Sequence, residues 1–441
     1  MKKRKYLYLP IETKSREFEA KMLLALEAVN RGYAVIIGNK SMNNLLKIMP
    51  TGVYFYMNST SPMQKIFAKF KSQGHIIVVH DEEGLVQSSD QRYMDGRLRF
   101  DTINEVDSYF CWGKHQKELV SKVVEEYSAN TKVVNTGHPR IDLLRSPISL
   151  YENPQKTEKS TILINTKHAE YNHNKGENGW IEIMKIHNMI NSQEEMDLRL
   201  DQVKYKKALF SEYKTLIEEL SSEFSNSNII VRPHPSENGN VWKIFAEDFP
   251  NVVVDRSKSV GYWIKKSDVV IHTSCTTGIE AFFLGKLPIT YKPIPEYRFG
   301  EALPDLVSFE TDNVKEVVDV IHSVIDDKFN IDEHFDKNVA KLEPYISNIS
   351  GPFSYQLIMD EIDKIPLIQY NISYFNHISL SMKIFVSHLS NIKNNLLNVE
   401  TRSISLEEMN DVVDKFVPIL KLRKRPKIKK LINNVYLIQN G

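Results

Sequence analysis

The chain has 441 residues, with 57 Lys and Arg against 56 Asp and Glu, and 41% of its residues are hydrophobic. This length predicts two or three domains, and the apolar fraction is large enough for packed cores. The near-zero net charge argues against a nucleic-acid partner, because nucleic-acid binders carry an excess of Lys and Arg to neutralise phosphates. The two cysteines, Cys111 and Cys275, lie far apart, which excludes a disulfide scaffold and a cysteine zinc site.

Membrane-spanning and secreted classes are not expected either. No uninterrupted run of about 18 apolar residues occurs, as a spanning helix would require. The basic start at 1–5 is followed by an apolar stretch too short for a signal peptide. We therefore expect a cytoplasmic protein.

Strand and helix patterns alternate over the first 150 residues. Short apolar runs predict strands, and apolar residues at helical spacing predict the helices between them. Alternation of this kind is typical of a parallel sheet built from βαβ units. The strands are expected at 6–9, 33–37, 52–57, 75–79, 107–112 and 131–135, and the helices at 15–30, 62–72 and 116–127.

The segment 151–355 repeats the same alternation. The polar, proline-containing stretch 146–160 predicts the boundary between two Rossmann-like domains, 1–150 and 151–355, with a cleft between them. In such sheets, ligands bind at the carboxyl ends of the strands. Strands are expected at 161–165, 228–232, 252–254, 268–272 and 287–291, and helices at 205–224 and 277–284.

The region 356–441 differs in character and is expected to be a helical, basic extension. Apolar periodicity marks 372–397 and 406–420, and a strongly basic run follows at 421–430. One interpretation of this run is a solvated helix face. The other is a patch attracted to anionic lipid head groups, which would place the protein on the inner face of the plasma membrane.

An acidic cluster follows directly on the strand predicted at 75–79. Asp81, Glu82 and Glu83 precede Gly84, which permits a tight turn at the carboxyl end of the strand. Mutual repulsion among these carboxylates would raise the pKa of one of them and leave a general base. The alternative is an acidic turn with a structural role only.

A rigid histidine turn follows the strand predicted at 228–232. Prolines on both sides of His234 fix its direction, so that its ring can donate to a phosphate while Arg232 binds the same anion. Pro235 completes this turn. The alternative is a proline-rigid turn with an incidental histidine.

A third polar segment links the strand at 268–272 to the helix at 277–284. Ser274, Thr276 and Thr277 offer hydroxyl groups to a phosphate at a helix start, and Glu280 can accept from ribose hydroxyls. Ordinary helix capping by Ser and Thr uses the same groups and stays open.

Two weaker segments could contribute to the same cleft. Asn165 and Thr166 end the first strand of the second domain and supply amide and hydroxyl donors. His138 and Arg140 close the first domain in a turn that we interpret mainly as an interdomain connection. The sequence carries no zinc signature or phosphate-binding glycine loop, and we expect no metal and no cofactor.

The order of these motifs resembles that in bacterial sialyltransferases and Kdo transferases, and more closely the bacterial surface carbohydrate biosynthesis protein group. The similarity spans about residues 5–350. It lies in Arg16-Glu17-Phe18-Glu19-Ala20-Lys21, Asp81-Glu82-Glu83-Gly84, Gly137-His138-Pro139-Arg140-Ile141-Asp142-Leu143-Leu144, Asn165-Thr166 and Arg232-Pro233-His234-Pro235.

The resemblance implies a GT-B fold, with an acceptor domain at 1–150 and a nucleotide-sugar donor domain at 151–355. It implies an inverting glycosyltransferase of surface polysaccharide synthesis, which moves a 2-keto sugar acid from a CMP-sugar to a glycan or lipid-linked glycan. Glu82 would be the general base and Glu83 the second acid, and His234 would contact the donor phosphate. Asp81, Arg16, His138 and Arg140 would line the acceptor side.

Two other functions stay open at this level. A GT-B transferase or epimerase that uses a UDP- or dTDP-sugar fits the helix start with Glu280 nearly as well. A non-catalytic scaffold of a polysaccharide assembly complex would need only the basic extension.

Overall fold

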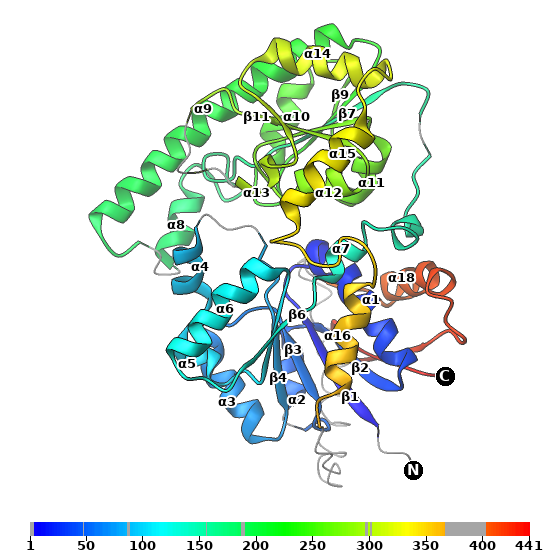
Figure 1. Ribbon diagram of the computed structural model, residues 1–441. Coiled ribbons are helices and arrows are strands. Elements are labelled where there is room, and N and C mark those ends of the chain that lie inside the picture. Colours follow the sequence, from blue (N-terminus) through cyan, green and yellow to red (C-terminus); the bar gives the residue numbers. More distant parts are fainter. Residues whose placement is uncertain are drawn as a thin grey trace. The chain divides into compact units, whose positions relative to one another are not determined.

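The structure is a computed structural model that describes residues 4–46, 48–85, 89–155, 157–186, 190–295, 299, 302–366 and 403–441 (Figure 1). It divides into two compact units. The first comprises Met1–Tyr151 and Glu343–Gly441, and the second comprises Glu152–Leu342. Within the described residues, no helix combines the length and the apolar character that crossing a membrane requires.

The first unit is built on an eight-stranded sheet in the order β13-β14-β2-β1-β3-β4-β5-β6. The strands β1 to β6 are parallel to one another, as the alternation of strands and helices predicts. Their bounds are β1 (Lys5–Ile11), β2 (Tyr33–Asn39), β3 (Val53–Tyr56), β4 (Ile76–His80), β5 (Ser108–Cys111) and β6 (Lys132–Asn135).

Helices cover both faces of this sheet. Residues of α1, α16 and α18 belong to the apolar core on one face, and residues of α2, α3 and α6 to the core on the other. The helices of the unit are α1 (Lys14–Asn30), α2 (Asn43–Leu46), α3 (Gln64–Ser72), α4 (Asp90–Arg97), α5 (Phe100–Ile103), α6 (Lys114–Glu126), α7 (Pro139–Asp142), α16 (Ser354–Asp363) and α18 (Leu406–Ile419), with short 3-10 turns at Lys40–Met42, Ser61–Met63 and Ile148–Tyr151.

The C-terminal region differs from the separate helical extension expected after residue 355. The helix expected at 406–420 is present as α18, but the basic run continues into a hairpin of β13 (Lys427–Ile432) and β14 (Val435–Gln439). β14 pairs antiparallel with β2, so this region completes the first sheet. Apolar residues at every second position, which are typical of a strand, explain the difference: Ile438 and Tyr436 are buried. The helix expected at 372–397 lies outside the described residues.

The second unit contains a six-stranded parallel sheet in the order β12-β11-β10-β7-β8-β9. Its strands are β7 (Thr161–Asn165), β8 (Asn228–Arg232), β9 (Val252–Val254), β10 (Val269–His272), β11 (Leu287–Tyr291) and β12 (Phe309–Thr311). Its helices are α8 (Gly179–Ile186), α9 (Gln193–Glu223), α10 (Gly239–Ala246), α11 (Val260–Lys266), α12 (Thr277–Phe283), α13 (Ala302–Asp305), α14 (Val314–Ile325) and α15 (Ile331–Val339), with a 3-10 turn at Ala340–Leu342.

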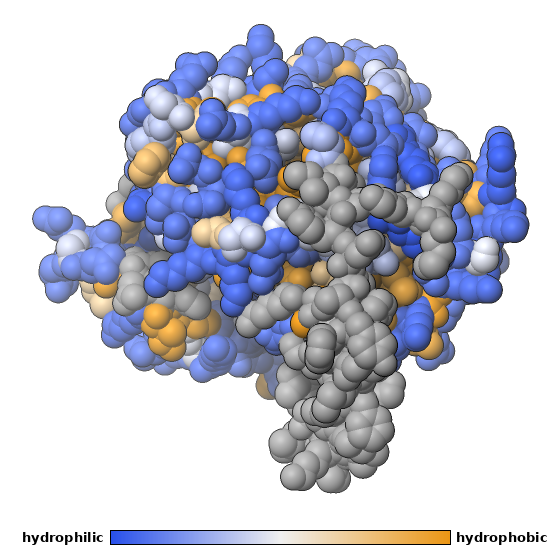
Figure 2. Space-filling model, turned by 90° about the horizontal axis from the view of Figure 1, so that it is seen from below, coloured by the Kyte–Doolittle hydropathy of each residue, from blue (hydrophilic) through white to orange (hydrophobic). Residues whose placement is uncertain are grey.

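Each unit thus has the Rossmann-like architecture that the sequence predicts, with helices packed on a sheet of parallel strands. The long helix α9 begins twelve residues before the expected 205, at Gln193, where the Ser192 side chain accepts the backbone N–H of Glu195. The described atoms visible in Figure 2 form a largely hydrophilic face, with hydrophobic residues in small separate areas.

Candidate functional site at two strand edges

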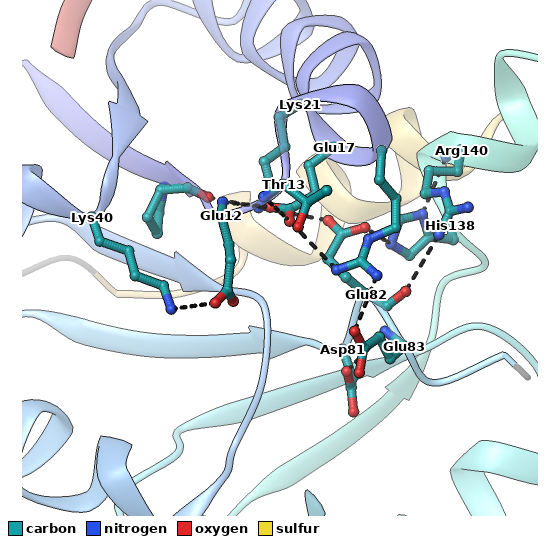
Figure 3. Close-up of polar contacts among 12 residues, drawn as sticks. Glu12, Thr13, Glu17, Lys21, Lys40, Asp81, Glu82, Glu83, His138 and Arg140 are labelled. Carbon is teal, nitrogen blue, oxygen red and sulfur yellow. Dashed lines mark hydrogen bonds and ion pairs between the residues drawn. The ribbon is translucent and has the colours of Figure 1, made fainter. Parts of the chain in front are cut away.

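Glu82 lies just beyond the carboxyl end of β4 and is buried. Its side chain is only 4% exposed, and its backbone N–H donates to the carbonyl oxygen of Met57 at 3.1 Å. The Lys21 Nζ lies 3.6 Å from Oε1, and the His138 Nε2 lies 3.5 Å from Oε2 (Figure 3). Among the described residues, Oε2 accepts no hydrogen bond. This carboxyl is therefore removed from water without full compensation.

Burial raises the pKa of Glu82 to about 7, against the partly offsetting positive charge of Lys21. The nearby negative charge of Glu17 raises this pKa further. The sequence predicted one raised carboxyl in the acidic cluster, but the cause differs from the one expected. Desolvation and a carboxylate from helix α1 act on Glu82, rather than repulsion from its two sequence neighbours.

Asp81 and Glu83 are held by arginines instead. Arg97 of α4 donates to both Asp81 carboxylate oxygens, at 2.7 and 2.5 Å, and to Glu83 Oε2 at 2.7 Å. Arg16 donates to Glu83 Oε1 at 3.0 Å. These guanidinium groups hold the pKa of Glu83 below its ordinary value despite partial desolvation. The ion pairs therefore keep Glu83 ionised, and its predicted role as a second acid stays a prediction.

Glu17 and Lys21 are two residues of this cluster to which the sequence assigned no role. The Lys21 Nζ donates to Glu17 Oε2 at 2.8 Å and to the carbonyl oxygen of Pro10 at 2.6 Å. The Glu17 carboxylate also accepts the backbone N–H groups of Glu12 and Thr13, which fixes the turn between β1 and α1. A Glu and a Lys four residues apart within the otherwise buried face of a helix are the sequence signal that could have found them.

His138 belongs to this cluster rather than to a simple interdomain turn. Its ring stacks on Trp112 at a centroid distance of 3.8 Å and lies 4.2 Å from the ring of His80. Its Nδ1 accepts the backbone N–H of Arg140, so the neutral ring carries its hydrogen on Nε2, which faces Glu82. Burial, together with nearby positive charge, keeps the pKa of His138 well below its ordinary value. Arg140 lies over the Trp112 ring, with Cζ 5.6 Å from the centroid.

In the second unit, the three strands that precede the predicted site residues, β7, β8 and β10, lie side by side in the sheet. Asn165 of β7 pairs in register with Arg232 of β8 and with His272 of β10. Asn165 is buried, and neither atom of its amide group has a hydrogen-bond partner among the described residues. The Arg232 Nε is likewise buried without a partner there. Desolvation lowers the pKa of Arg232, and the carboxylate of Glu280 opposes that shift.

The turn after β8 is organised by a buried carboxyl that the sequence analysis missed. Glu237 accepts from the Thr166 hydroxyl at 2.9 Å, the Trp242 Nε1 at 2.9 Å and the His234 backbone N–H at 3.0 Å. Thr166 is therefore engaged in supporting the turn rather than presented as a donor. The only sequence signal for Glu237 is its position three residues after the histidine.

His234 itself is exposed and has a defined tautomer. Its Nδ1 accepts the backbone N–H of Ser236 at 3.2 Å, so the neutral ring carries its hydrogen on Nε2. Pro235 is also exposed, and its carbonyl oxygen accepts from the Asn174 side chain. The turn thus presents the Nε2–H of His234 as a donor to an anion.

The loop after β10 only partly matches the expected phosphate site. The Ser274 hydroxyl donates to Asp305 Oδ2 at 3.1 Å, and the Thr277 hydroxyl contacts the Cys275 sulfur at 2.6 Å. Ser274 has a φ of 48°, a backbone conformation that serine rarely adopts. Thr276 stands at the N-cap of α12, but its side chain forms no capping bond. Of the three hydroxyls, that of Thr276 is best placed to meet a ligand.

Within the described part of the chain, no group of three or more His, Cys, Asp or Glu residues could hold a metal ion. His168 and His173, five residues apart in the sequence, do not form such a group either. His168 is fully buried against the rings of Phe210, Tyr213 and Trp242, which assigns it to the core of the second unit.

No protein-family model and no curated protein sequence matches the chain, but many solved structures do. A protein from Listeria monocytogenes assigned as a UDP-N-acetylglucosamine 2-epimerase has a TM-score of 0.51 at 12% identity, over 84% of this chain and 100% of that chain. The Neisseria meningitidis UDP-GlcNAc 2-epimerase bound to UDP-GlcNAc has a TM-score of 0.50 at 14% identity, over 82% and 100%.

The chain has a GT-B type fold. The fold class expected from the sequence is thereby confirmed, and the matches extend over the whole length of both solved chains. At 12 and 14% identity the likeness concerns the fold, and the reaction must be argued from the residues of this chain.

Proposed function

We propose that this protein is a glycosyltransferase that moves a sugar from a nucleotide-linked donor, best a UDP-sugar, to a hydroxyl group of a glycan or lipid-linked glycan. The observation that supports this most is the buried carboxyl of Glu82, whose pKa of about 7 suits a general base at neutral pH. The proposed setting is the synthesis of a surface polysaccharide.

In the proposed reaction, Glu82 takes the proton from the acceptor hydroxyl. The acceptor oxygen then forms a bond to the anomeric carbon, while the bond from that carbon to the phosphate oxygen breaks. The electron pair leaves with the nucleotide, and a single displacement inverts the anomeric centre. His138 is the positioning residue, because its Nε2–H faces Glu82 Oε2.

The second unit supplies the groups that would bind the donor phosphates. Arg232 provides a positive charge, and the exposed Nε2–H of His234 provides a hydrogen-bond donor. The buried amide of Asn165, which has no partner among the described residues, is a further donor next to Arg232 in the sheet. Such groups stabilise the negative charge that develops on the leaving phosphate.

The motifs and the fold favour different nucleotides in the donor. The motifs favour a CMP-linked 2-keto sugar acid as the donor. The solved structures of the same fold include a UDP-GlcNAc 2-epimerase bound to UDP-GlcNAc, which favours a uridine diphosphate sugar. We place UDP first, and a CMP-sugar is the alternative.

A second candidate function is epimerisation of the UDP-sugar, as in the named relatives of the fold. Removing a proton from one face of a sugar ring and returning one to the other face needs two proton carriers. In the acidic cluster after β4, Asp81 and Glu83 form ion pairs with arginines, and Glu82 is the carboxyl with a pKa near neutrality. This arrangement favours deprotonation of a single hydroxyl, and therefore transfer.

Two measurements test the proposal. Thermal shifts with UDP, CMP, CDP and dTDP rank the nucleotides, since a ligand that binds the folded state raises its stability. Preference for CMP would replace UDP in the proposal, and no response to any nucleotide would favour the scaffold function. NMR of the UDP-sugar incubated with the protein in deuterated water then separates the two reactions, because epimerisation without an acceptor exchanges a ring proton and transfer does not.

The Glu82→Gln variant tests the base directly. It should lose 10²- to 10⁴-fold in turnover, the range typical of general-base catalysis, and keep its thermal response to UDP. Glu83→Gln changes the adjacent acid, which Arg16 and Arg97 hold ionised, and it should lose less activity than Glu82→Gln. Full activity in Glu82→Gln would contradict the assignment of the base.

A further inference from the structure

The hairpin at the edge of the first sheet concentrates positive charge on one exposed border, which we name the basic edge. Its side chains come from β13, from the segment that precedes β13 and from the residue directly before β1. The members of the basic edge are Arg4, Lys421, Arg423, Lys424, Lys427, Lys429 and Lys430.

These charges are not neutralised within the part of the chain that the structure describes. No ion pair there involves any member of the basic edge, and all members except the half-buried Lys430 are exposed. Arg425 in the same segment shows the contrast, because it forms a two-pronged ion pair with Asp414 of α18 at 2.6 and 3.2 Å. The positive charges of the basic edge can therefore attract an anionic partner.

Tertiary structure, rather than the basic run alone, assembles this edge. β14 brings Gln439 into register with Lys427, and Arg4 Nη1 donates to the side chain of Gln439 at 2.5 Å. Residues from the beginning and the end of the sequence thus meet on one border of the sheet. The first unit carries this border as part of its own fold.

The geometry of β13 spreads the charges along a line. β13 is the last strand in the sheet order, so its outer side faces no further strand of the described chain. Lys427 and Lys429 point to one face about 7 Å apart, and Lys430 points to the other. Lysines on an edge strand also oppose pairing with a second sheet, which argues against a second copy of this chain as the partner.

A cavity beside the hairpin combines apolar and cationic groups. It has a volume of about 280 Å³ and is lined by the half-buried Leu422, the cations Arg423 and Lys424, and the amides Asn30 and Asn440, over the buried Val29 and Pro426. Leu422 offers apolar surface next to two cations, which suits a molecule that has an anionic head and a hydrocarbon portion. A free phosphate would use only the cations.

We propose that the basic edge binds the surface of a bilayer that contains anionic lipids and holds the protein there without inserting a spanning segment. Attraction of basic segments to anionic lipids acts over about a Debye length and grows with each added cation. A nucleic acid fits less well, because single-strand sites place aromatic rings among the basic groups, whereas the hairpin's Tyr436 is buried. The proposal does not depend on the reaction proposed above.

The test is co-sedimentation of the full chain with vesicles of phosphatidylcholine alone or with 30% phosphatidylglycerol. We expect binding to the mixed vesicles only, and release at about 0.5 M salt, where screening shortens the range of the attraction. The fourfold variant Arg423→Gln, Lys424→Gln, Lys427→Gln, Lys429→Gln should bind at least tenfold more weakly. The matched control removes the same charge elsewhere, at the exposed residues Lys114, Lys204, Lys328 and Lys337.

Each outcome of this test either supports or overturns the membrane proposal. Loss of vesicle binding in the fourfold variant, with binding retained in the control, would support the proposal, provided that both variants keep the melting temperature of the parent. Equal loss in both variants would show a general charge effect and overturn it. Absence of binding to mixed vesicles, or binding to a duplex oligonucleotide but not to vesicles, would also overturn it.

Discussion

The Lys21 Nζ lies 3.6 Å from Glu82 Oε1, and both side chains are only 4% exposed. The same ammonium group donates to Glu17 Oε2 at 2.8 Å, so one buried cation serves two buried carboxylates. The positive charges of Arg140 and Arg16 also act on Glu82, and Arg16 Nη2 lies 3.7 Å from Glu17 Oε1. Burial outweighs these positive charges and, together with the negative charge of Glu17, raises the pKa of Glu82 to about 7.

The first prediction concerns how Glu17 and Lys21 set the pH profile. The ionised form of Glu82 is the active base, so activity should rise with pH through about 7. Glu17→Gln removes a like charge and should move this limb to lower pH. Lys21→Met removes a positive charge that favours ionised Glu82, so the rising limb should move to higher pH. Each unit by which the pKa of Glu82 rises should lower the activity at pH 7 about tenfold.

The measurement is kcat/KM as a function of pH for the parent and both variants. Lys21→Arg, which keeps the charge, should leave the limb close to 7 and controls for loss of packing. Lys21→Met also removes the ammonium group hydrogen-bonded to the buried Glu17, and breaking a buried ion pair costs about 3–5 kcal/mol, so its folding must be checked by thermal melting. Shifts of both variants in the same direction would refute the proposed electrostatic control.

The second prediction concerns the stability cost of Glu82. Its pKa in the folded state exceeds the ordinary value of 4.5, so the folded protein binds more protons than the unfolded chain between about pH 4.5 and 7. The free energy of unfolding should therefore decrease as the pH rises through this window. Glu82→Gln removes this pH dependence. The free energy of unfolding of the variant minus that of the parent should therefore be larger at pH 8 than at pH 5, by on the order of 3 kcal/mol. Urea unfolding at both pH values measures the difference, and a constant difference would count against the raised pKa.

The third prediction separates the predicted phosphate ligands from one another. Arg232→Gln should abolish most of the thermal shift caused by UDP, because the guanidinium has no carboxylate hydrogen-bonded to it among the described residues. Ser274→Ala should keep most of that shift, because the Ser274 hydroxyl already donates to Asp305. Thermal melting with increasing UDP compares the two variants. The reverse order of effects would place the phosphate at the loop after β10.

The fourth prediction concerns a contact that joins distant parts of the first unit. The buried Asp142 carboxylate accepts the backbone N–H groups of Ser354 at 3.0 Å and Tyr355 at 2.8 Å. It thereby caps α16, whose own N-cap residue, Phe353, cannot do so. Asp142→Ala should lower the free energy of unfolding by about 2 kcal/mol, and Asp142→Asn, which keeps an acceptor, by less. Urea unfolding tests this order, and no loss in Asp142→Ala would exclude the cap.

The fifth prediction tests whether the C-terminal hairpin is part of the first unit. A Cβ on Gly38 of β2 would lie 2.1 Å from the carbonyl oxygen of Asn434, which belongs to the hairpin turn. Gly38→Ala should therefore displace the hairpin and lower the free energy of unfolding by at least about 2 kcal/mol. Gly96→Ala is the control, because a Cβ there meets no atom within 4 Å and alanine favours the helix. An unchanged melting temperature in Gly38→Ala would mean that the hairpin is not held as the structure shows.

The sequence carries enough information to predict most strands and the parallel arrangement. A buried strand such as β4 or β10 is marked by a short run of β-branched residues, and the helix between two such strands is marked by its period. The C-terminal hairpin was not predicted, because the basic residues of β13 hide its alternation. Its pairing with β2 joins residues about 400 positions apart, and no local pattern encodes such a contact.

The sequence alone determined where the polar groups of the candidate site stand along the chain: Glu82 after one buried strand, Arg232 and His234 after another. These positions follow from local rules, since a strand of apolar residues must end where polar ones begin. Only the tertiary structure decided which carboxyl is buried without full compensation by neighbouring positive charge. Lys21 and Glu17 reach Glu82 from helix α1, while Arg97 neutralises Asp81 and Glu83 from α4. Desolvation and charge depend on distances in space, so the folded chain sets the pKa of Glu82.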